Sequence, residues 1–146
     1  MPESSGLLFD VNALVALTLT THQHHQAAHR FLAQHNGPWA TSPMTESALC
    51  RLLLNPVVAG VQRSFGEVVV IVKGFAQDPR WVFLADDSRL SDPSVDPRVI
   101  MGHSQVTDLH LLNLAVRHNM RLATFDGKLL SGVAPADRHR MVLIPS

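Results

Sequence analysis

Four acidic side chains stand where strands are predicted to end or helices to begin. Asp10 closes the apolar run LLF, and Asp126 closes the run RLATF. Glu46 falls in the first turns of the helix predicted after WATS, and Asp108 opens the helix predicted from QVTDLHLLNLA. In a parallel α/β sheet, the carboxyl ends of strands and the starts of the following helices share one edge. We therefore expect the four carboxylates to meet in one cleft.

Four carboxylates in one cleft would repel each other and raise one another's pKa values unless cations compensated their charge. Mg²⁺ is the natural cation, because it is a hard ion that takes oxygen ligands and keeps several waters. Mn²⁺ suits the same donors, whereas zinc prefers histidine or cysteine. Such ions can activate a water and stabilise the oxygens of an in-line phosphodiester displacement. The acids therefore indicate metal-assisted hydrolysis of a phosphodiester.

Each acid taken alone has an ordinary structural explanation. Asp10 could cap a helix, and Asp126, which precedes a glycine, could be a turn residue. Asp108 could sit in a first helical turn because of the helix dipole, and Glu46 could be a solvated or capping residue. Only the placement of all four acids at one edge of the sheet favours a functional site.

Strand-like and helix-like segments alternate along the chain. We expect strands over 6–10, 39–42, 81–86, 121–126 and 141–144. We expect one helix that starts near residue 11, another that ends at residue 36, and further helices over 43–54, 64–77 and 106–118. Over 86–98 we expect a polar loop with at most one helical turn. The run VVVIV could be a strand by propensity, but Ser64 and Glu67 have capping-box spacing. This alternation predicts an α/β fold with a central parallel sheet covered on both faces.

The composition narrows the class of protein. A length of 146 residues suggests a single domain over 1–146. Twelve basic and 12 acidic residues cancel, which argues against a protein held to nucleic acid by bulk charge. The single cysteine, Cys50, excludes an intrachain disulfide and favours a reducing, cytoplasmic setting. No run of about 18 apolar residues predicts a membrane span.

Three segments are similar to segments of one known family. LLFDVNALVAL is similar to a first strand with its Asp and following Asn, and ATSPMTESALCRLL to a segment that carries a Glu. VTDLHLLNLAVRHNMRLATFDGKL, with one acid opening a helix and another closing a strand, is the most specific match. Together they resemble a PIN domain, specifically a VapC-type toxin of a bacterial toxin–antitoxin pair, over nearly the whole chain.

The resemblance implies a three-layer α/β/α fold with a central parallel sheet flanked by helices. It implies that four acids bind Mg²⁺ or Mn²⁺ for RNA cleavage: Asp10, Glu46, Asp108 and Asp126. Two further residues match polar positions that support the site, Asn12 and Thr124. It also implies a homodimer and inhibition by a small antitoxin. Some relatives carry an extra acid beside the last one, but Phe125 and Gly127 flank Asp126, which leaves one metal ion or two open.

The candidate RNA contacts are basic side chains: Arg51, Arg117, Arg121, Lys128, Arg138 and Arg140. Lys128 follows the turn after Asp126 and could reach a phosphate, and Arg51 is a second candidate on the helix of Glu46. Six Phe, two Trp and no Tyr argue against a broad stacking platform, so we expect recognition of RNA shape and phosphates with one or two stacked bases. The helices over 43–77 are candidates for dimer or antitoxin contacts by their apolar content.

The stretch HQHHQAAH is the other place where chemistry could lie. His22, His25 and His29 would share one helix face, and the last two have the i, i+4 spacing of zinc ligands. A solvated helix face is the favoured interpretation, with adventitious metal binding as the alternative. Cys50 is interpreted as a small apolar residue near the core.

Two other functions stay open at this point. A phosphoryl-transfer or receiver-like domain would use Asp10 as phosphoacceptor, although one such pattern wants a second Asp where Asn12 stands. A non-catalytic binding module of the same fold is the other alternative. The sequence names neither the RNA nor the antitoxin.

Overall fold

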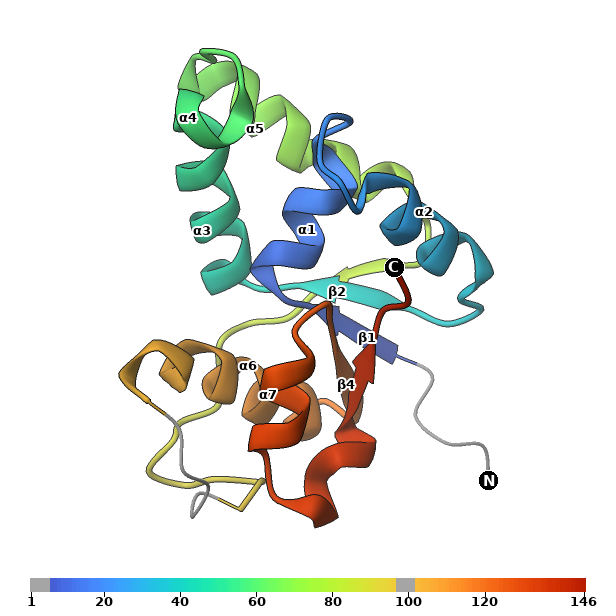
Figure 1. Cartoon of the computed structure of the whole chain (residues 1–146), viewed down its shortest axis with the longest axis vertical. Coiled ribbons are helices and arrows are strands. Elements are labelled where there is room, and N and C mark those ends of the chain that lie inside the picture. The colour runs from blue at the N-terminus through green and yellow to red at the C-terminus, as the bar shows by residue number, and fades with distance from the viewer. Residues whose placement is uncertain (1–5, 97–101) are drawn as a thin grey trace.

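Five strands form one parallel sheet in this computed structural model, which describes residues 6–96 and 102–146 (Figure 1). In chain order they are β1 (Gly6–Phe9), β2 (Trp39–Thr41), β3 (Trp81–Phe83), β4 (Met120–Thr124) and β5 (Met141–Leu143). Their order across the sheet is β3-β2-β1-β4-β5. The five predicted strands are confirmed, although each prediction ran past the observed carboxyl end.

Helices cover both faces of this sheet, which gives three layers (Figure 1). One face carries α1 (Val11–Thr18), α2 (His25–Gln34), α3 (Pro43–Leu54), α4 (Pro56–Ala59) and α5 (Phe65–Lys73). The other face carries α6 (Val106–Arg117) and α7 (Gly127–Gly132). Short 3₁₀ turns complete the chain: η1 (Gly74–Gln77), η2 (His103–Gln105) and η3 (Pro135–Arg140). The α/β/α fold is confirmed, while α4, α7 and η3 were not predicted.

The strands separate two hydrophobic cores because successive side chains point to opposite faces. Leu7 and Phe9 of β1 pack in the core under α1 and α3, whereas Leu8 packs in the core under α6. All three side chains are at most 1% exposed. A strand buried on both faces has no polar position, which explains the unbroken apolar run before Asp10.

A capping box decides the conformation of the β-branched run after residue 64. Ser64 Oγ accepts a hydrogen bond from Glu67 N at 3.1 Å, and Glu67 Oε1 accepts one from Ser64 N at 2.9 Å. Both bonds satisfy N–H groups at the first turn of α5. The predicted helix over 64–77 is confirmed as α5 followed by η1.

A long loop after β3 is tied to α6 by the buried side chain of Asn113. Its Oδ1 accepts a hydrogen bond from Ser94 N at 2.6 Å, and its Nδ2 donates to Arg89 O at 3.2 Å. Residues 86–96 of the predicted loop contain no helical turn, and residues 97–98 lie outside the described residues. The loop therefore takes its shape from α6 rather than from a helix of its own.

Over residues 6–96 and 102–146, every helix falls short of the length and apolar character that crossing a bilayer requires.

Candidate active site

Asp10 lies directly after β1, at the carboxyl edge of the sheet, and is 3% exposed. Its Oδ1 accepts a hydrogen bond from Ala13 N at 2.8 Å, so Asp10 caps α1. Its Oδ2 accepts a short hydrogen bond from Thr124 Oγ1. The capping and the site interpretations of Asp10 are therefore compatible, because the two oxygens have different partners.

Thr124 is the last residue of β4 and is fully buried. Besides donating to Asp10, its Oγ1 accepts a hydrogen bond from Asp126 N at 3.0 Å. The hydroxyl thus joins the Asp10 carboxylate to the backbone that carries Asp126. The structure thus shows the contacts of Thr124, and its supporting role in the site stays a prediction.

Asp126 lies two residues beyond β4 and caps α7. Its Oδ1 accepts hydrogen bonds from Lys128 N at 2.9 Å and from Leu129 N at 3.2 Å. The strand predicted over 121–126 ends at Thr124, and the predicted turn at Asp126 is the start of a helix. The prediction was wrong there because a helix of six residues with a glycine at each end carries too little periodicity to be seen.

Burial and neighbouring aspartates raise the pKa values of Asp10 and Asp108. Burial raises the pKa of Asp10 from its ordinary 3.8 to about 6, against the effect of its hydrogen bonds, and the charges of Asp108 and Asp126 add to the rise. Burial, and then the charge of Asp126, also raise the pKa of Asp108, in the first turn of α6. The edges of β1 and β4 and the start of α6 therefore bring these carboxylates into one neighbourhood.

Glu46 is positioned by a separate chain of hydrogen bonds. Trp81 Nε1 donates to Thr41 Oγ1 at 3.0 Å, and Thr41 Oγ1 donates to Glu46 Oε2 at 2.5 Å. Glu46 raises the pKa of Cys50, one turn along α3, as a contribution second to burial. It does not contribute to the raised pKa values of Asp10 and Asp108. The structure thus orients Glu46 at the same edge without coupling it to those two aspartates.

The donor set fits a hard divalent cation, although its members are not gathered as ligands. In the part of the chain that the structure describes, no three His, Cys, Asp or Glu side chains lie close enough to hold one ion. In both Asp10 and Asp126, one carboxylate oxygen accepts the hydrogen bond that caps a helix. However, all four side chains offer carboxylate oxygens, which Mg²⁺ and Mn²⁺ prefer. The buried charge of Asp10 is the kind of charge that a cation would stabilise.

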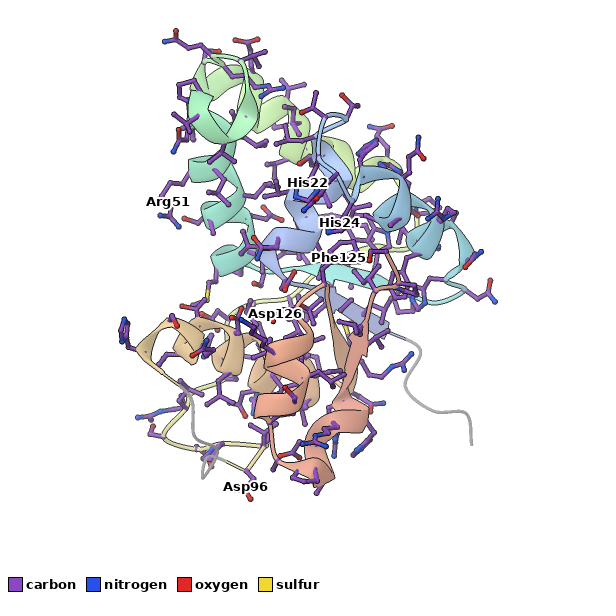
Figure 2. All side chains as sticks on the ribbon, in the orientation of Figure 1. His22, His24, Arg51, Asp96, Phe125 and Asp126 are labelled. Atoms are coloured by element: carbon purple, nitrogen blue, oxygen red, sulfur yellow. The ribbon has the colours of Figure 1, made fainter. Side chains whose placement is uncertain are left out.

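The remaining predicted residues differ in their distance from the acids. Asn12 is exposed in the first turn of α1 and lines a hollow together with Asp126. Lys128 is exposed, and its backbone is fixed by Asp126. Arg51 points outward from α3, well separated from Asp126 (Figure 2). The structure therefore brings Asn12 and Lys128 near the acids but not Arg51.

Two residues that support this edge were not predicted from the sequence: Thr41 and Trp81. Thr41 ends β2 in the triplet Trp-Ala-Thr, as Thr124 ends β4 in Leu-Ala-Thr. Each threonine donates its hydroxyl proton to one of the acids. A threonine that ends a buried strand close to a predicted acid is the sequence feature that could have identified Thr41. The prediction applied it to Thr124 alone.

The predicted solvated face of His22, His25 and His29 is only partly present: His29 is exposed on α2, His25 is partly buried, and His22 lies before the helix. The helix α2 begins at His25, so His22 and His24 lie in the preceding loop. His25 Nδ1 lies 2.7 Å from Ala16 O, and His29 Nε2 lies 2.9 Å from Leu17 O. These two side chains tie α2 to carbonyls at the end of α1, which lack a helical partner.

Known proteins resemble this chain in sequence and in fold. The PIN domain family model matches residues 7–134. Ribonuclease VapC38 of Mycobacterium tuberculosis is 41% identical over 120 residues, which cover 82% of this chain and 84% of that protein. Ribonuclease VapC29 of the same species is 34% identical over 140 residues, covering 96% and 97%. A crystal structure of M. tuberculosis VapC20, described as a sarcin–ricin loop cleaving toxin, matches this chain with a TM-score of 0.59 at 15% identity. The match covers 88% of this chain and 96% of that one, and it shows that the two proteins share a fold.

An all-parallel five-stranded sheet with aspartates at its carboxyl edge is thus the framework of a PIN domain. The chain belongs to the PIN domain family, as a VapC-type member.

Proposed function

We propose that this chain is a Mg²⁺-dependent endoribonuclease that acts as the toxin of a toxin–antitoxin pair. The observation that carries the proposal is that Asp10 is buried at the carboxyl edge of the sheet, where the charges of Asp108 and Asp126 repel its own charge and add to the rise of its pKa. Such repulsion is typical of a site that works with a cation. The curated relatives named as ribonucleases support an RNA substrate, which would place the activity in the cytoplasm.

Four side chains would hold Mg²⁺ or Mn²⁺: Asp10, Glu46, Asp108 and Asp126. When bound, the ion supplies activation of water and neutralisation of the phosphate charge. The chain's own contribution is orientation. Thr124 and the N–H of Ala13 fix the two oxygens of Asp10, while Thr41 fixes Glu46. Such partners hold ligands in the right direction and increase the affinity for the ion.

Residues outside the acids would position the RNA. Lys128 is exposed in the first turn of α7, and its ammonium group would reach a phosphate beside Asp126. Asn12 projects from the first turn of α1 at the same edge and would orient a ligand or a water. The exposed Arg51 lies too far along α3 for the same phosphate, so it would contact RNA only beyond the cleavage site.

The antitoxin and a second copy of the chain would be bound by the helices over 43–77. Five large apolar side chains are exposed there: Val57 is 90%, Val58 42%, Val61 51%, Phe65 61% and Val70 68% exposed. They lie on α4, on α5 and between these two helices, at the end of the molecule away from the sheet (Figure 1). Exposed apolar groups gathered at one end are typical of contact surfaces between proteins.

The phosphoacceptor alternative is disfavoured by the sequence after Asp10. One such pattern wants a second Asp two residues on, where this chain has Asn12.

The test is cleavage of total RNA by purified protein in Mg²⁺, in Mn²⁺ and in EDTA. Wild type and an Asp92→Asn control, which alters an exposed carboxylate in the loop after β3, should cut at discrete positions in either metal. An Asp108→Asn variant should not cut, and EDTA should stop all cutting. Equal cutting by Asp108→Asn would contradict the proposal.

A further inference from the structure

A hollow of about 260 Å³ opens beside the acidic edge, and no proposed role yet uses it. Its walls come from three segments: the first turn of α1, the loop between α1 and α2, and the two residues that follow β4. Six residues line it: Asn12, His22, Gln23, His24, Phe125 and Asp126. Figure 2 shows His22, His24 and Phe125 close together beside Asp126. One wall of the hollow therefore belongs to the proposed cleavage site.

Three rings form a row in this hollow. The rings of His24 and Phe125 are stacked, with centroids 4.7 Å apart and planes at 16°. The ring of His22 lies 5.7 Å from that of His24, tilted by 46°. All three side chains are partly exposed. One more planar group can stack on a flat, partly exposed pair of rings, and every nucleobase has a face that can stack in this way.

The row is held in place before any ligand arrives. His24 N donates a hydrogen bond to His22 Nδ1 at 3.0 Å, and His22 N donates to Leu19 O at 3.0 Å. Burial, and then the neighbouring His24, lower the pKa of His22, which favours its neutral form. A neutral ring that accepts at Nδ1 carries its proton on Nε2, where it is a donor. Ordered rings reduce the entropy lost on binding.

The lining fits a base rather than a phosphate. It contains no lysine or arginine, and it includes the Asp126 carboxylate, which would repel an anion. Asn12 and Gln23 are exposed and each offer an amide, which can pair with the edge of a base. Unpaired bases in single-stranded RNA are commonly held in this way, by a stacking ring and polar groups at the base edge.

We propose that this hollow binds one unpaired nucleobase next to the phosphodiester that is cut, with the His24–Phe125 stack as its platform. The base so bound sets the base preference at the cleavage site. This inference rests on the proposed function, because it supplies the substrate contact for the same edge.

The experiment compares His24→Ala, which removes the ring, with His24→Phe, which keeps a flat ring. Phe125 also packs against the core under α1, so variants of His24 disturb folding less. His139→Ala, an exposed histidine in η3, is the matched control. Cut ends in total RNA are sequenced first. The kinetic constants kcat and KM are then measured on an oligoribonucleotide that spans the mapped cut, and Tm is measured for each variant.

We expect His24→Ala to raise KM about 5- to 150-fold, the effect of losing one stacked base, and to relax the base preference beside the cut. His24→Phe should stay within about twofold of wild type in KM. The inference is overturned if His24→Ala, with unchanged Tm, keeps the wild-type KM and cut sites, or lowers kcat alone. If wild type cuts no RNA, the proposed function itself fails and the inference with it.

Discussion

Replacing Asp10 with asparagine should make folding stability less dependent on pH in metal-free buffer. The Asp10 carboxylate is buried, and its pKa rises from 3.8 to about 6 on folding. The folded protein therefore holds the Asp10 proton more tightly than the unfolded chain does. The contribution of this group to stability is complete below about pH 4 and is lost as the pH rises through about 6. Asparagine carries no charge at any of these pH values.

The size of the effect follows from that rise in pKa. A change from 3.8 to about 6 corresponds to about 3 kcal/mol of unfolding free energy between the protonated and charged limits. Between about pH 4.5 and about pH 7.5 wild type should lose about 2 kcal/mol that the variant keeps. The variant also leaves the Thr124 hydroxyl without its acceptor, but that cost is the same at both pH values. Only the change with pH is compared.

The assay is urea denaturation in EDTA, with Asp92→Asn as the control for losing an exposed carboxylate. At the higher pH, adding Mg²⁺ should stabilise wild type and leave Asp10→Asn nearly unchanged, because a ligand stabilises the state that binds it. A difference between wild type and Asp10→Asn that stays constant across the pH range would refute the argument from the buried charge.

Two further variants test the hydrogen bonds that orient Glu46 and those that hold the loop after β3. Thr41→Val keeps the shape of the buried side chain but frees Glu46 and leaves Trp81 Nε1 without its acceptor. The rate of RNA cleavage should fall about 10- to 100-fold, and the unfolding free energy should fall by about 1–3 kcal/mol. An unchanged rate would show that Glu46 needs no such support. Asn113→Leu should lower the unfolding free energy by about 1–3 kcal/mol, because two backbone groups lose their partner. Urea denaturation measures this, and unchanged stability would mean that the loop after β3 is held by other contacts.

The sequence predicted those parts of the fold whose signals are local. The apolar run before Asp10 marks β1, and the spacing of Ser64 and Glu67 marks α5 despite a β-branched run. The strand ends were less clear, because Asp126 continues an extended segment and only the tertiary structure shows that it caps α7.

The supports of the acids could not be predicted in the same way. Thr41, which donates to Glu46, accepts a hydrogen bond from Trp81, 40 residues later in the chain, and no local pattern connects Thr41 with Trp81. The histidines of α2 were assigned to solvent because the carbonyls that they contact lie on α1. The stack of His24 on Phe125 joins segments about 100 residues apart. Such contacts follow from the sheet order, which brings the start of the chain beside β4.

The central claim is that the carboxyl edge of the sheet holds a divalent cation for RNA cleavage. The most direct measurement is a Mn²⁺ titration followed by electron paramagnetic resonance, on wild type, Asp108→Asn, Glu46→Gln and the Asp92→Asn control. Wild type and the control should bind Mn²⁺ alike, and the other two variants should bind at least about tenfold more weakly. Equal binding by wild type and Asp108→Asn would contradict a cation site at this edge.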